Sequence, residues 1–61
     1  MSNEINEKWL EIKEMLSLAE EDIEKNSRGN KAAGARARKK IRALRNELSL
    51  LIKLSLAKSK E

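Results

Sequence analysis

The sequence contains one turn signal, which divides an otherwise helix-favouring chain of 61 residues into two segments. It lies at residues 26–30, where Gly29 can adopt the left-handed conformation that ends a helix and Asn30 can cap the next one. Proline is absent, and Glu, Lys, Leu, Ala and Arg, which favour helices, dominate on both sides. The sequence predicts an all-α fold with helices at about residues 3–26 and 30–57 and a turn at residues 27–29.

The apolar residues of both segments recur mainly at spacings of four and three, the pattern of a helix with one apolar face. Ser2 or Asn3 can cap the first helix, and the acidic side chains of Glu4 and Glu7 favour the positive end of its dipole. The two seams consist of Ile5, Trp9, Ile12, Leu16, Ala19 and Ile23, and of Ala33, Ala37, Ile41, Leu44, Leu48, Leu51 and Ser55.

The two seams match in size when the chain is folded back near residue 28. Small residues meet near the turn, where Ala19 faces Ala37, and large residues meet at the open end, where Trp9 faces Leu48. This agreement predicts an antiparallel two-helix hairpin with Trp9 in its core.

The second helix is the longer one, so its last residues overhang the start of the first. Leu50, Leu54 and Leu56 then have no partner within the chain and lie on different sides of the helix. We expect a second chain to cover them in an antiparallel dimer that forms a four-helix bundle; the alternative is a frayed end beyond Leu56. The expected oligomer interface consists of Trp9, Leu48, Leu50, Leu51, Ile52, Leu54 and Leu56.

Side chains that carry chemistry are scarce. Cysteine and histidine are absent, which removes disulfides, thiolate nucleophiles and the usual zinc ligands. Glu7, Glu11 and Glu14 share one side of the first helix, but without histidine they are typical of an exposed acidic face and not of a carboxylate metal site. The acidic start is unlike a signal peptide, and the apolar cluster at residues 48–56 is too short to span a bilayer. We therefore expect a soluble protein that is not an enzyme, with no cofactor, metal or small-molecule substrate.

The two halves of the chain carry opposite charge. Residues 1–26 contain eight acids against three lysines, a balance of −5, whereas residues 27–61 contain eleven Lys or Arg against two Glu, a balance of +9. Residues 28–45 hold eight cations and no acid. This split predicts a polyanionic partner for the basic half.

Four cations of the second segment project from one side of a helix that turns about 100° per residue, and further cations spread round the exposed side. Such a row can follow DNA phosphates, and the release of counterions then drives binding that depends little on base sequence. The expected residues for contacts to double-stranded DNA are Lys31, Arg38, Arg42 and Arg45 in the row, with Arg36 and Lys39 beside it.

Alternatives stay open for this segment. Its cations could face the acids of residues 20–24 across the hairpin, although four acids cannot neutralise eight cations. Asn30 and Lys31 start a helix, where free N–H groups favour an anion. Gly34 lowers helix propensity, which indicates close approach either of the first helix or of a nucleic-acid backbone.

The basic segment begins with a distinctive run, GNKAAGARARK at residues 29–39. An acidic amphipathic helix precedes it and a Leu-rich helix follows it. In these features the sequence resembles the chlamydial histone H1-like family and its short relatives in other bacteria, most specifically at residues 29–33, Arg36 and Arg38. The resemblance implies a nucleoid-associated DNA-binding protein of the bacterial cytoplasm whose helical part self-associates. The chlamydial members continue into a long Lys/Ala/Pro-rich tail, whereas this sequence stops at Glu61, so we expect binding to rest on the helical region.

The sequence thus favours a non-enzymatic, histone-like DNA-binding protein that acts as an oligomer through phosphate contacts. The alternative is a helical protein–protein interaction module without nucleic-acid binding, which a lack of DNA binding at low salt would select. A membrane-surface helix is disfavoured because the cations and leucines of the second segment follow one another along the helix and do not form opposite faces.

Overall fold

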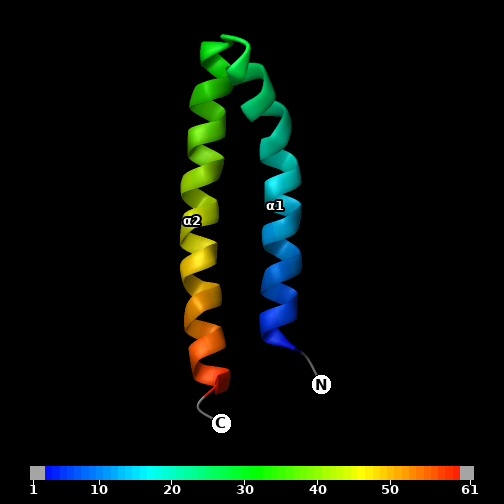
Figure 1. The fold of residues 1–61 in the computed structure, drawn as a ribbon, viewed down its shortest axis with the longest axis vertical. Coiled ribbons are helices and arrows are strands. Elements are labelled where there is room, and N and C mark those ends of the chain that lie inside the picture. The colour runs from blue at the N-terminus through cyan, green and yellow to red at the C-terminus, as the bar shows by residue number, and fades with distance from the viewer. Residues whose placement is uncertain (1–2, 60–61) are drawn as a thin grey trace.

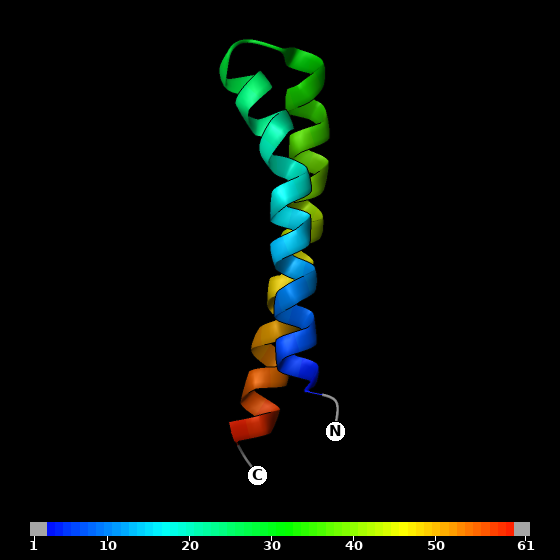
Figure 2. The same ribbon diagram turned by 90° about the vertical axis from the view of Figure 1, so that its right-hand side faces the viewer.

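The computed structural model describes residues 3–59, which form two helices and no strand. Helix α1 spans Glu4–Ser27 and helix α2 spans Lys31–Ser59. The helices run side by side in opposite directions, and both chain ends lie at the end away from the turn (Figure 1; Figure 2). The molecule is therefore a slender antiparallel hairpin, 48 × 18 × 12 Å, and the all-α hairpin predicted from the sequence is confirmed.

Side-chain caps define where both helices begin. The carboxamide oxygen of Asn3 accepts a hydrogen bond from the N–H of Asn6 at 3.1 Å, and Asn30 accepts one from the N–H of Ala33 at 3.0 Å. Each cap satisfies one of the N–H groups that the first turn of a helix leaves free. Ser2, the other cap considered for α1, lies outside the described residues.

The turn closes α1 with a pair of backbone hydrogen bonds. The N–H of Gly29 donates to the carbonyl of Asn26 at 2.9 Å, and the N–H of Asn30 donates to the carbonyl of Lys25 at 3.1 Å. Gly29 has φ +99°, which glycine adopts without the clash that a Cβ atom introduces. This glycine is therefore what allows the chain to reverse within three residues.

The hairpin core is narrow and consists mostly of small side chains. Ala19, Ala33 and Ala37 are buried near the turn, and Ile12 and Leu44 are buried towards the open end. Small residues let the two backbones approach closely, and the larger pair fills the space where the helices need more volume. Ile12 is the largest side chain among the described residues that is fully buried.

The contact between the helices follows a different line from the predicted seam. Ile12 and Ala19 lie on this line, whereas Trp9, Leu16 and Ile23 lie on its flank and are 43–49% exposed. Trp9, expected in the core, is therefore not buried by the hairpin. The reason is that charged residues occupy part of the contact: the side chain of Lys8 is only 22% exposed and bonds to Glu47 across the hairpin at 2.7 Å.

Candidate nucleic-acid interface

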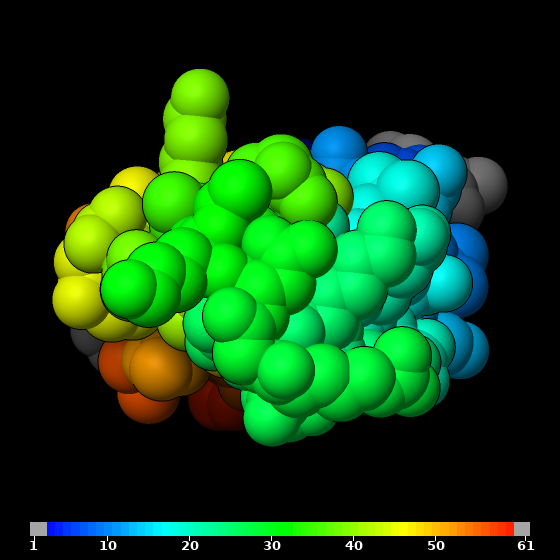
Figure 3. Space-filling view, turned by 90° about the horizontal axis from the view of Figure 1, so that it is seen from above, coloured from blue at the N-terminus to red at the C-terminus, as the bar shows by residue number. Residues whose placement is uncertain are grey.

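Most of the cations predicted to contact DNA are exposed and have no acidic partner. In the view onto the turn, a side chain from the yellow-green part of α2 stands clear of the rest of the molecule (Figure 3). The cations without an acidic partner therefore have charged groups that an anion can reach. They are Lys31, Arg38, Lys39, Arg42 and Arg45, none of which forms an ion pair with another described residue.

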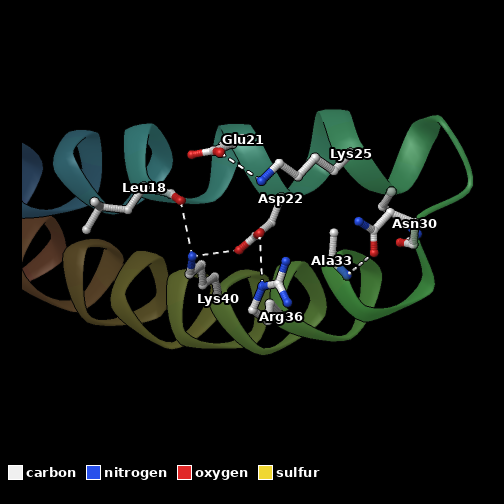
Figure 4. Close-up of polar contacts among 9 residues, drawn as sticks. Leu18, Glu21, Asp22, Lys25, Asn30, Ala33, Arg36 and Lys40 are labelled. Carbon is white, nitrogen blue, oxygen red and sulfur yellow. Dashed lines mark hydrogen bonds and ion pairs between the residues drawn. The ribbon is translucent and has the colours of Figure 1, made fainter.

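Arg36 differs from the other predicted residues because it is held by α1. Its Nε donates to Oδ1 of Asp22 at 3.1 Å, while Nζ of Lys40 donates to Oδ2 of the same carboxylate at 2.7 Å and to the carbonyl of Leu18 at 3.2 Å (Figure 4). Asp22 itself is only 6% exposed. One acid of α1 therefore holds two cations of α2 against the hairpin.

The hydrogen bond from Lys40, reinforced by the one from Arg36, lowers the pKa of Asp22 below its ordinary value. The carboxylate is thus charged at neutral pH and stabilises both cations. Arg36 keeps a side chain that is 52% exposed, so part of its guanidinium still faces solvent. Among the predicted contacts, it is the one whose charge is largely offset within the chain.

The unpaired cations point away from α1. At about 100° per residue, Lys31, Arg38, Arg42 and Arg45 span roughly 60° of the circumference of α2, on the side opposite Arg36 and Lys40. We call these four residues the basic stripe. The sequence predicted their common direction, and the ion pairs of α2 leave all four of them free.

Other ion pairs lie on or beside the side of the hairpin that carries Asp22. Nζ of Lys8 bonds to Glu11 at 2.8 Å and to Glu47 at 2.7 Å, and these bonds raise the pKa of its ammonium. Lys25 bonds to Glu21 at 2.9 Å and lowers the pKa of that carboxyl. Four of the five described ion pairs thus engage an acid of α1, and none of them involves the basic stripe.

The turn end has fewer free N–H groups than the sequence suggests. Asn30 takes the N–H of Ala33 with its side chain, and its carbonyl accepts from Gly34 at 3.2 Å. A Cβ atom on Gly34 would be too close to the side chain of Asn26, which donates to the Asn30 carbonyl at 3.3 Å. The close approach of α1 therefore accounts for Gly34, and no nucleic-acid backbone is needed to explain it.

The residues expected in an oligomer interface fall into four groups. Leu51 and Leu54 are half-buried on the hairpin contact itself, and Leu50 lies on the flank that carries the ion pairs. Leu56, at 59% exposed, lies near the end of α2. The remaining three, Trp9, Leu48 and Ile52, lie on the opposite flank. They share it with large apolar residues that the sequence prediction assigned to the core. We call this set the apolar face; it consists of Trp9, Leu16, Ile23, Ile41, Leu48 and Ile52, each 43–61% exposed.

Two other features, a metal-ion site and a membrane-spanning helix, are absent from the part of the chain that the structure describes. Its Asp and Glu side chains form no group of three or more that could hold a metal ion. Neither α1 nor α2 is long and apolar enough to cross a membrane.

Comparison with known proteins supplies a family. No curated protein and no solved structure matches the chain. A family model described as histone H1-like protein Hc1 matches residues 6–61, which include all of α1 except its first two residues, the turn, α2 and the whole basic stripe. The protein therefore belongs to the histone H1-like protein Hc1 family.

Proposed function

We propose that this protein is a non-enzymatic, histone-like protein of the nucleoid that binds double-stranded DNA through phosphate contacts and acts as an oligomer. The basic stripe of α2 supplies these contacts. Membership of a histone H1-like family supports this function, and so does the charge of the helix itself.

The observation that carries the proposal is the unneutralised charge of α2. The helix contains nine Lys or Arg and one Glu. Of its seven cations between Lys31 and Arg45, Arg36 and Lys40 are the ones that bond to a described acid of α1. A helix of 29 residues that presents a row of free cations attracts DNA because each neutralised phosphate releases condensed counterions. Contacts of this kind position a protein on DNA but carry little base sequence information.

The proposal predicts that the affinity for DNA falls steeply as the salt concentration rises, and that this dependence comes from the residues of the basic stripe. Replacing Lys31 and Arg42, which both point away from α1, by alanine should weaken binding to unrelated duplexes alike. Each phosphate contact contributes about −0.9 to the slope of log K against log salt, so the double variant should lose up to about 1.8 of that slope. The measurement is a fluorescence-anisotropy titration on two unrelated duplexes over a series of salt concentrations.

A matched control removes the same charge elsewhere. Lys13 and Lys25 are exposed cations of α1 and lie outside the stripe, so K13A/K25A should keep most of the affinity and slope of the original chain. Equal losses in both double variants would mean that net charge matters and the stripe does not. No binding to either duplex at low salt would reject DNA as the ligand and leave the protein–protein interaction module.

A further inference from the structure

Each helix has a wider apolar stripe than the other helix can cover. In α1, Ile12 and Ala19 are buried, but Trp9, Leu16 and Ile23 recur every seven residues along the adjacent flank. In α2, Ile41 and Leu48 repeat this offset beside Ala37 and Leu44. Because both flanks lie on the same side of the hairpin, the uncovered halves join into the apolar face. A helix with two adjacent apolar stripes is typical of a bundle in which it has two neighbours.

The surface area of the hairpin shows how much remains to be covered. A compact monomer of 7.0 kDa exposes about 4,000 Å², whereas this chain exposes 5048 Å². The excess is close to the roughly 800 Å² that each partner buries in a stable interface. The apolar face, with six large side chains about half exposed, is large enough to account for most of that area.

The charges of the two helices decide how a second copy fits. Helix α1 carries eight acids against three lysines, and α2 carries nine Lys or Arg against one Glu. If each helix packed on its own copy, two α1 helices with a net charge of −5 each would be neighbours, and so would two α2 helices with a net charge of +8 each. If each α1 packs beside the partner's α2, helices of opposite net charge are neighbours, chiefly in the half near the turn, where seven of the nine cations of α2 lie.

We propose that a second copy of this chain covers the apolar face, with α1 of each copy beside α2 of the other. The turns of both hairpins then lie at the same end, in place of the antiparallel dimer expected from the sequence. The inference rests on the self-association included in the proposed function, and it names the surface and the arrangement. The two-fold axis then runs along the hairpin and keeps residues at equal heights opposite one another.

This arrangement places one specific pair of opposite charges together. The ion pairs of Asp22 with Arg36 and Lys40 put Asp22 level with residues 36–40, so Glu20, two residues further from the turn, lies within one helical turn of the height of Arg38. Glu20 borders the apolar face because it follows Leu16 by four residues, and Arg38 borders it because it precedes Ile41 by three. Arg38 of one copy therefore meets Glu20 of the other. With the turns at opposite ends, α2 would instead pack on α2 of the other copy, and Arg38 would meet no acid of α1.

A distance measurement distinguishes the two arrangements. The chain has no cysteine, so S27C beside the turn accepts one spin label per copy. With the turns together, the two labels should lie about 20–30 Å apart, a separation set by the width of a four-helix bundle. Turns at opposite ends would separate the labels by about 40 Å or more, because α1 is 24 residues long. That longer distance, or a chain that stays monomeric at micromolar concentration, would overturn the proposal.

Two pairs of variants test the surface itself by sedimentation without DNA. L16Q places an amide on the apolar face and should abolish the dimer, whereas L18Q makes the same change on the Asp22 side, where Leu18 is 63% exposed, and should not. R38E should weaken the dimer roughly tenfold, and the exchange E20R/R38E should restore it. If L16Q and L18Q behave alike, or if R38E strengthens the dimer, the assignment is wrong. A dimer of the expected geometry that does not bind DNA would reject the proposed ligand and leave this inference intact.

Discussion

At the scale of single residues, Asp22 decides which cations stay available. Its carboxylate holds Arg36 and Lys40, so the predicted contact at Arg36 is largely offset inside the chain while Lys31 and Arg42 are not. The direction of the cations followed from the 100° turn per residue. Their pairing could not be predicted in the same way, because Asp22 is 14 and 18 residues away from its partners and lies among several acids that could have taken its place.

Replacing Asp22 by Asn should destabilise the hairpin at neutral pH, because Arg36 and Lys40 would then be close together without a compensating charge. We expect the Tm at pH 7 to fall by a few degrees. The folded pKa of Asp22 lies below its unfolded value, so this carboxylate stabilises the fold above about pH 4 and ceases to do so as the pH falls through the folded pKa. Thermal unfolding followed between pH 7 and pH 3 should therefore show the two proteins converging in acid.

The control for this change is E21Q, which removes a neighbouring acid. Glu21 pairs with Lys25 within α1 and is well exposed, so its loss should alter the Tm little. If E21Q and D22N lowered the Tm equally at neutral pH, the contact across the hairpin would contribute nothing beyond helix charge.

At the scale of elements, the sequence was sufficient for two helices and their antiparallel packing but not for the line along which they touch. The alternation of four and three selected Ile12 together with Leu16, and Leu44 together with Leu48. In the structure the first of each pair is buried and the second is about half exposed. The helices are rotated relative to the predicted seams because Lys8, Asp22 and their partners occupy positions in the contact between them. A pattern of apolar residues alone does not include these charged positions. Each predicted seam therefore combined parts of two faces.

The turn between the elements depends on one backbone conformation. Gly29 has φ +99°, so G29A should destabilise the fold by about 1–2 kcal/mol, and G29N should cost less because asparagine tolerates a left-handed backbone better. The measurement is chemical unfolding followed by circular dichroism. R28A changes the adjacent residue, whose φ is −93°, and should be nearly neutral. A G29A variant as stable as R28A would show that the turn does not constrain the fold.

At the scale of the whole molecule, the hairpin has two unlike sides. One side is held by the ion pairs of Asp22 and Lys8, and the other is the apolar face. The basic stripe points away from α1 and borders the apolar face at Arg38 and Arg45. Self-association through the apolar face would leave Lys31 and Arg42 directed outwards. In the proposed assembly Arg38 therefore belongs to the interface between the copies, and Lys31 and Arg42 remain available to DNA phosphates.

The hairpin core alone is too small for a robust monomer, since the core of residues 3–59 consists of five buried apolar residues, three of them alanines. Folding should therefore be coupled to association, and the Tm should rise with chain concentration. A tenfold rise in concentration stabilises a dimer by about 1.4 kcal/mol. Two chains of 61 residues unfold with an entropy of about 0.25 kcal/mol/K, so each tenfold step should raise the Tm by about 5 °C. Thermal melts followed by circular dichroism at tenfold concentration steps measure this shift, and L16Q should unfold at a low Tm that barely depends on concentration. If the unmodified chain melts at one temperature across the whole series, the hairpin is stable without a partner and the apolar face is not needed for folding.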